Sequence, residues 1–114
     1  MPRRGLIALD ALHSKAMKSQ LDVVAHIQAA PGEEALVRKV LESYVIPTRL
    51  EEGCLRYDLF IDGDDPSKFT FIEEWSCAES LHKHSQSAHI TAGRAQVEGK
   101  LARPGQVMKL TRIL

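Results

Sequence analysis

Two alternating stretches joined by a dense turn constrain this fold more than any other sequence feature. In residues 54–61 and 68–75, large apolar or aromatic side chains recur at every second position, which is the period of a half-buried β-strand. The apolar positions are Leu55, Tyr57, Leu59 and Ile61 in the first stretch, and Phe69, Phe71 and Trp75, with Glu73 on the same parity, in the second. The linker Asp-Gly-Asp-Asp-Pro-Ser is rich in turn-forming residues. The region therefore predicts an antiparallel hairpin.

A strand and a helix are predicted on either side of this hairpin. Residues 21–30 alternate as a strand until Pro31-Gly32, and a helix then starts at Glu33-Glu34, kinks or restarts at Pro47 and ends by Gly53. After the hairpin, Ser76-Cys77-Ala78-Glu79 has the spacing of a capping box. That second helix is expected to be interrupted at 85–87, to resume to about residue 101, and to be followed by a strand over 106–113.

The resulting order is β-α-β-β-α-β, which is the ferredoxin-like arrangement of the α+β class. It predicts one four-stranded antiparallel sheet with both helices on one face. The other face should be wet, yet Val24, Phe60, Ile72 and Leu110 show that both strand parities carry apolar residues. A sheet that is apolar on both faces needs a second cover, and we expect a homodimer joined sheet to sheet.

Composition narrows the class of protein. The chain has 114 residues, enough for one domain, which we place at 21–114 behind an N-terminal extension at 1–20. Its 15 basic and 15 acidic residues cancel, which argues against nucleic-acid binding. Apolar runs are too short to cross a membrane, and a cytoplasmic location is expected. In that setting Cys54 and Cys77 are expected to be reduced.

One helix face and one strand end could form a site. His84 shares a helical stripe with Leu81 and Ala88, so it should point inward towards Glu73 and Trp75. A buried Glu73 would need a partner, and His84 or Tyr57 could supply one. Such a pair could equally be a structural hydrogen bond of the core.

The other histidines are less constrained. His89 follows His84 by five residues, about 140° round an unbroken helix, so only a break at 85–87 would return it to the site. His82 is expected to face solvent. His26 could reach the site or the dimer interface. We expect no metal site, because the spacing lacks a metal-ligand motif, and no nucleotide or flavin fingerprint is present.

Two segments resemble a known family. They are residues 45–54 (Val-Ile-Pro-Thr-Arg-Leu-Glu-Glu-Gly-Cys) with Tyr57, and Ile72-Glu73-Glu74-Trp75 followed by His84 and Ser87-Ala88-His89. They are similar to the antibiotic biosynthesis monooxygenase domain, and most of all to its small bacterial quinol-monooxygenase-like members, over residues 21–114. The resemblance implies a dimeric α+β barrel with a pocket between sheet and helices. It also implies oxidation of quinols or electron-rich aromatics by molecular oxygen, commonly without metal or flavin.

The resemblance also implies roles for single residues. Trp75, Glu73 and the pair His84 and His89 match catalytic-pocket positions of the family, and Tyr57 matches a pocket tyrosine. His84 or His89 would orient or deprotonate a substrate hydroxyl while Trp75 and Phe71 pack against its ring.

Two alternatives stay open beside this interpretation. His26 is a further candidate for substrate binding. It stands where polyketide-tailoring and heme-degrading relatives tend to have asparagine, which argues against both a polyketide and heme as the substrate. An isomerase or heme-degrading oxygenase on the same scaffold, and a non-catalytic small-molecule-binding dimer, are the alternatives.

Overall fold

The computed structural model describes residues 20–114, so residues 1–19 of the expected extension lie outside the described part. The described elements are β1 (Leu21–Gln28), α2 (Glu34–Ser43), α3 (Val45–Arg49), β2 (Cys54–Ile61), β3 (Lys68–Trp75), α4 (Ala78–Ser85), α5 (Ala88–Val97) and β4 (Gln106–Leu110). The strands form one antiparallel four-stranded sheet in the order β2-β3-β1-β4. The predicted α+β ferredoxin-like fold is confirmed.

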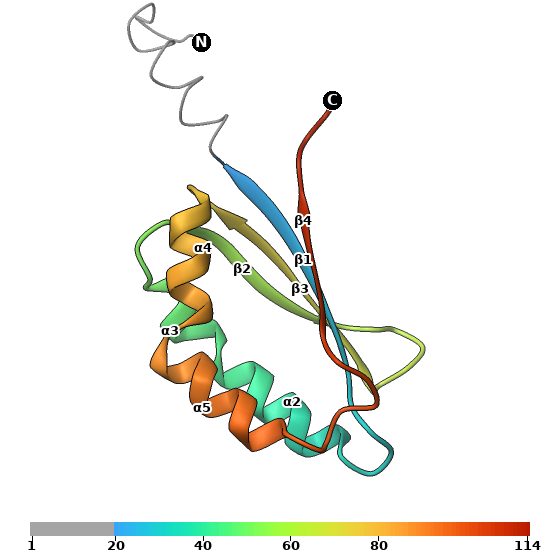
Figure 1. Cartoon of the computed structure of the whole chain (residues 1–114). Coiled ribbons are helices and arrows are strands. Elements are labelled where there is room, and N and C mark those ends of the chain that lie inside the picture. The colour runs from blue at the N-terminus through green and yellow to red at the C-terminus, as the bar shows by residue number, and fades with distance from the viewer. Residues whose placement is uncertain (1–19) are drawn as a thin grey trace, which may run out of the picture.

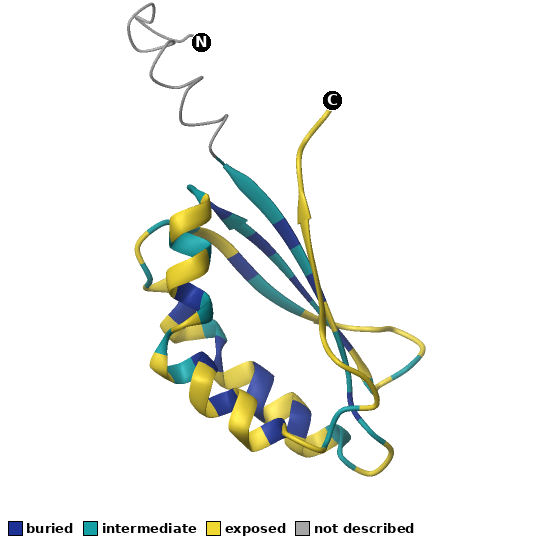
Figure 2. Ribbon diagram, viewed as in Figure 1, coloured by how far each residue is buried: buried dark blue, intermediate teal, exposed yellow. Residues whose placement is uncertain are grey.

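The four helices of the described range lie on one side of the sheet (Figure 1). The alternating strand residues that face them form the core, with Val23 and Ala25 of β1 paired to Glu73 and Phe71 of β3. Val37, Val40 and Leu41 of α2 are buried from the helix side. In contrast to these buried residues, β4 (Gln106–Leu110) is exposed along its whole length (Figure 2). The helices therefore cover one face of β1, β2 and β3, while the other face of the sheet and both faces of β4 are open.

A β-bulge in β2 corrects the predicted face of Leu55. Cys54 pairs with Trp75 but Arg56 pairs with Glu74, so Leu55 is an extra residue on its strand. An extra residue turns its side chain out of the alternation, and Leu55 is 56% exposed. The bulge also moves Cys54 onto the covered face, in the same alternation as Tyr57.

The first predicted helix is divided in two before its proline. The backbone N–H of Thr48 donates to the Tyr44 carbonyl at 3.1 Å, which starts the short helix α3. Pro47 sits inside the first turn of α3, where the missing N–H of proline costs little. This restart turns Thr48 into the core, where it is fully buried.

The second helical region differs from the prediction at its start and its end. The capping box does not form, because Cys77 is the N-cap and the Ser76 N–H donates to the Gly53 carbonyl at 2.8 Å. The break at 85–87 is present between α4 and α5. Helix α5 ends at Val97 rather than near residue 101, and Gly99 then turns the chain with a φ of +75°. None of the helices in the described range is both long and apolar enough to cross a bilayer.

Candidate functional site

The imidazole of His84 lies at the centre of the candidate site. It is in the last turn of α4, is 7% exposed, and points to the sheet as its helical stripe predicts. Its ring centre lies 4.8 Å from that of Trp75 and 5.3 Å from that of Tyr57. Phe71 extends the same wall, with its ring centre 4.8 Å from that of Tyr57. His84 is therefore enclosed on one side by aromatic rings.

Glu51 is the polar partner of His84, and the sequence did not reveal it. Its Oε1 lies 2.7 Å from His84 Nδ1, across 33 residues of chain. The turn after α3 positions this carboxylate through two backbone hydrogen bonds, from the Glu51 N–H to the Thr48 carbonyl and from the Cys54 N–H to the Glu51 carbonyl. Glu51 belongs to the Glu-Glu-Gly-Cys segment that carries the family resemblance, and this was the signal available to find it.

The protonation of His84 follows from its surroundings. Burial lowers the pKa of His84 below its ordinary value, and the nearby Glu51 carboxylate opposes that change without reversing it. A neutral imidazole carries one proton, and the Glu51 carboxylate can only accept, so the proton belongs on Nδ1. The other ring nitrogen, Nε2, is then a proton acceptor.

His89 joins this group because the helix breaks. It stands in the first turn of α5, and its ring centre is 6.1 Å from that of His84. Its Nε2 lies 2.9 Å from the Thr48 hydroxyl oxygen and 3.9 Å from Glu51 Oε2. Thr48, like Glu51, lies in the 45–54 segment that carries the family resemblance, but neither was singled out as a site residue from the sequence. The ligand atoms of Glu51, His84 and His89 lie within 4.8 Å of one another, so this group could hold a metal ion.

The partner of Glu73 is Trp75 rather than His84 or Tyr57. The Trp75 indole N–H donates to Glu73 Oε1 at 2.8 Å, between two residues on the same face of β3. Burial raises the pKa of Glu73, and the hydrogen bond from Trp75 only partly opposes this. The carboxyl group thereby fixes the plane of the indole beside His84. Burial likewise raises the pKa of Tyr57 far above its ordinary value, so its phenol stays protonated.

His26 does not join the site. It alternates out of the core on β1, is exposed on the open face of the sheet, and its Nδ1 lies 3.0 Å from the Thr70 hydroxyl oxygen. The covered face of β1 is the one that carries Val23 and Ala25, so the parity of residue 26 excludes it. The expectation that His26 contacts a substrate in this pocket is corrected on that ground.

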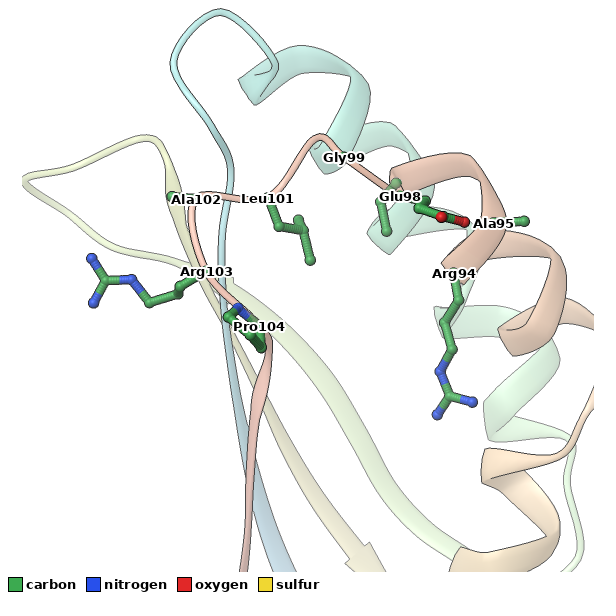
Figure 3. A pocket seen from close by; sticks show the side chains of 9 residues that line it. Arg94, Ala95, Glu98, Gly99, Leu101, Ala102, Arg103 and Pro104 are labelled. Atoms are coloured by element: carbon green, nitrogen blue, oxygen red, sulfur yellow. The ribbon is translucent and has the colours of Figure 1, made fainter.

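A shallow groove of about 670 Å³ lies further along α5, between its C-terminal end and the turn into β4 (Figure 3). Arg94, Val97, Leu101 and Pro104 contribute to its walls. The guanidinium of Arg94 also donates to the Ser85 carbonyl at 2.9 Å, at the end of α4. Arg94 is thus the residue that connects the groove to the break beside His84.

Comparison with known proteins gives the family. The pattern of the family "Antibiotic biosynthesis monooxygenase" matches residues 21–96. The protein Rv0793 of Mycobacterium tuberculosis, provisionally named a monooxygenase, is 33% identical over 94 residues, covering 82% of this chain and 92% of the relative. YgiN of Escherichia coli, provisionally named a quinol monooxygenase, is 31% identical over 90 residues, covering 69% of this chain and 86% of the relative.

Solved structures agree. PA3566 of Pseudomonas aeruginosa superimposes with a TM-score of 0.80 at 33% identity, covering 86% of this chain and 98% of that one. The structure of Rv0793 superimposes with a TM-score of 0.78 at 32% identity, covering 83% and 96%. The chain belongs to the antibiotic biosynthesis monooxygenase family.

Proposed function

We propose that this protein is a monooxygenase that oxidises a quinol or another electron-rich aromatic hydroxyl compound with molecular oxygen, without a metal or flavin. The observation that carries the proposal is the His84–Glu51 pair, a neutral buried imidazole held by a carboxylate at 2.7 Å beside aromatic rings. The provisional name of YgiN as a quinol monooxygenase supports the substrate class.

The pair supplies a base. Glu51 accepts the Nδ1 proton and stabilises the imidazolium that forms when His84 Nε2 takes a proton from the substrate hydroxyl. The resulting phenolate is electron-rich enough to pass an electron to oxygen. The substrate supplies all the electrons that O₂ takes up and both hydrogens of the water, so one oxygen atom enters the ring, the other leaves as water, and a quinol becomes a hydroxyquinone. The protein holds the ring and excludes water, and Trp75 and Phe71, which are 0% and 2% exposed, belong to the buried aromatic wall behind His84.

The solvent-facing side of the site marks the route of access. Trp75 and Tyr57 are buried, whereas the side chains of His89 and Glu51 are 23% and 21% exposed. In this proposal the substrate therefore approaches from the side of Glu51 and His89, at the break between α4 and α5, and its hydroxyl group meets the histidines there. His89, held by the Thr48 hydroxyl at 2.9 Å, is placed to orient that hydroxyl group.

A second copy of the chain covers the open face of the sheet in this proposal. Phe60, Met108 and Leu110 are 45%, 42% and 43% exposed there. Val24 lies between Met108 and Ile72 in the strand register, which makes the apolar area continuous across three strands. Burying such an area is worth about 25 cal/mol per Å², so a sheet-to-sheet homodimer is the favoured assembly.

Oxygen uptake tests the activity. Chelator-treated protein is mixed with a panel of reduced quinones and phenols, and product formed under ¹⁸O₂ is analysed by mass spectrometry for one incorporated atom. His84→Ala should lower the rate about 10²- to 10⁴-fold, the usual value of a general base. His82→Ala, an exposed histidine of the same helix, should leave the rate unchanged.

Two results would contradict the proposal. Quinol oxidation that survives combined substitution of His84 and Trp75 would remove the assigned base and its ring wall from the mechanism. Failure of every substrate in the panel, together with no visible absorbance on heme titration, would favour a non-catalytic binding dimer.

A further inference from the structure

Three side chains that are far apart in the sequence converge at the break between α4 and α5. Glu51 comes from the turn after α3, His84 from the last turn of α4 and His89 from the first turn of α5. Glu51 Oε1 is 2.7 Å from His84 Nδ1, and Glu51 Oε2 is 3.9 Å from His89 Nε2. The five-residue spacing of the histidines conceals this convergence, because only the break at 85–87 brings both imidazoles to one carboxylate.

We propose that Glu51, His84 and His89 form a binding site for one divalent transition-metal ion of the zinc and cobalt type. Two imidazoles and a carboxylate are the donor set of three-ligand zinc sites, which keep a fourth position for water. Metal–nitrogen and metal–oxygen bonds of about 2.0–2.2 Å place tetrahedral ligand atoms roughly 3.3–3.5 Å apart. One ligand atom from each of the three residues lies within 4.8 Å of the other two, so small side-chain adjustments would bring the set to that range.

The surroundings of the three residues suit such an ion. His84 is almost fully buried and backed by Trp75, so one side of the site is closed to solvent. Glu51 and His89 are about one-fifth exposed, which gives an ion and its water a path from solvent. The Thr48 hydroxyl, 2.9 Å from His89 Nε2, is the present partner of that nitrogen, and a bound ion would take its place.

A metal ion bound at this site would affect the proposed oxidation. This consequence rests on the proposed function, whereas the metal site itself does not. An imidazole that binds an ion through Nδ1 carries its proton on Nε2. His84 then has no free nitrogen to accept a proton from substrate. The bound ion therefore inhibits the metal-free reaction, and it does so in competition with the His84–Glu51 hydrogen bond.

Metal titration tests the site without reference to activity. Untagged full-length protein is titrated with Co²⁺, read by its visible d–d absorption, and with Zn²⁺ by calorimetry. One ion per chain is expected, with the intense visible bands of a four-coordinate Co²⁺ site. Glu51→Gln and His89→Ala should each weaken binding at least about 10-fold, since loss of even an outer partner has that effect. Circular dichroism checks that both variants are folded.

The matched control removes the other histidines. A His13→Ala, His26→Ala, His82→Ala variant retains the proposed ligands and should bind as the parent does. Absence of Co²⁺ binding, loss of binding in this control, or unchanged binding in both ligand variants would each overturn the metal site. Oxygen uptake of the chelated protein is measured separately, so that a failed oxidation with intact Co²⁺ binding rejects only the proposed function.

Discussion

Replacing Gly93 by alanine should destabilise the protein, against the usual effect of that change in a helix. Gly93 is buried in α5, and a Cβ built there would stand 2.6 Å from Tyr44 Cζ and closer still to Cε1 and the hydroxyl oxygen of the same side chain. Carbon atoms pack at about 3.5–4.0 Å, so the ring must move by about 1 Å or more. It has little room, because Tyr44 is buried and stacked on Phe71 with ring centres 6.1 Å apart.

The magnitude is set by two opposed terms. Alanine is favoured over glycine in a helix by about 1 kcal/mol, whereas overpacking a core costs about 1–3 kcal/mol, and this overlap belongs at the upper end. We expect a net loss of about 2 kcal/mol in the free energy of unfolding. Urea denaturation at fixed protein concentration measures it, using the fluorescence of Trp75, the single and fully buried tryptophan.

Two variants isolate the cause of that loss. Ala92→Gly, at an exposed position of the same helix, should cost only the propensity term of about 1 kcal/mol. Tyr44→Ala should be less damaging in the Gly93→Ala background than in the parent, because the ring is what the new methyl group meets. A Gly93→Ala protein as stable as the parent would show that α5 and Tyr44 are not packed as described.

Three further predictions concern charge and assembly. Because burial lowers the pKa of His84, oxygen uptake should fall only as the pH drops below the ordinary histidine value of 6.5; a rate profile centred above 6.5 would contradict the assigned base. Burial raises the pKa of Glu73, so the favourable contribution of its carboxyl group to stability is complete below pH 4.5 and is lost as the pH rises through the pKa of the folded state. The urea midpoint of Glu73→Gln relative to that of the parent should therefore increase from about pH 4 to about pH 8. A difference that stays constant over this range would refute the prediction. Met108→Lys should convert a dimer to a monomer by light scattering while Leu50→Lys, on the helix side, should not; a monomeric parent at micromolar concentration would exclude the dimer.

The sequence alone determined the elements and their order. Alternation with period two is a local property, so the strands around the turn at 62–67, and which of their residues share a face, were predictable. The restart near Pro47 and the break at 85–87 were predictable too, because proline and the Ser-Gln-Ser segment act on the backbone next to them. The inward direction of His84 followed from its helical stripe. The resemblance then pointed to the family that the comparisons show.

Only the tertiary structure decided which side chains of the site contact one another. Glu51 meets His84 across 33 residues and Thr48 meets His89 across 41, and no local period encodes contacts at such separations. The bulge at Leu55 and the hydrogen bond from the Ser76 N–H to the Gly53 carbonyl depend on the pairing of β2 with β3. Strand alternation alone puts His26 and Ala25 on opposite faces of β1, but only the packing of the helices decided which of the two faces is covered. The partners of buried polar and charged side chains depend on the whole tertiary structure. A buried polar group that has lost its water needs a hydrogen-bond partner, and the packing of distant segments determines which groups are near enough to serve.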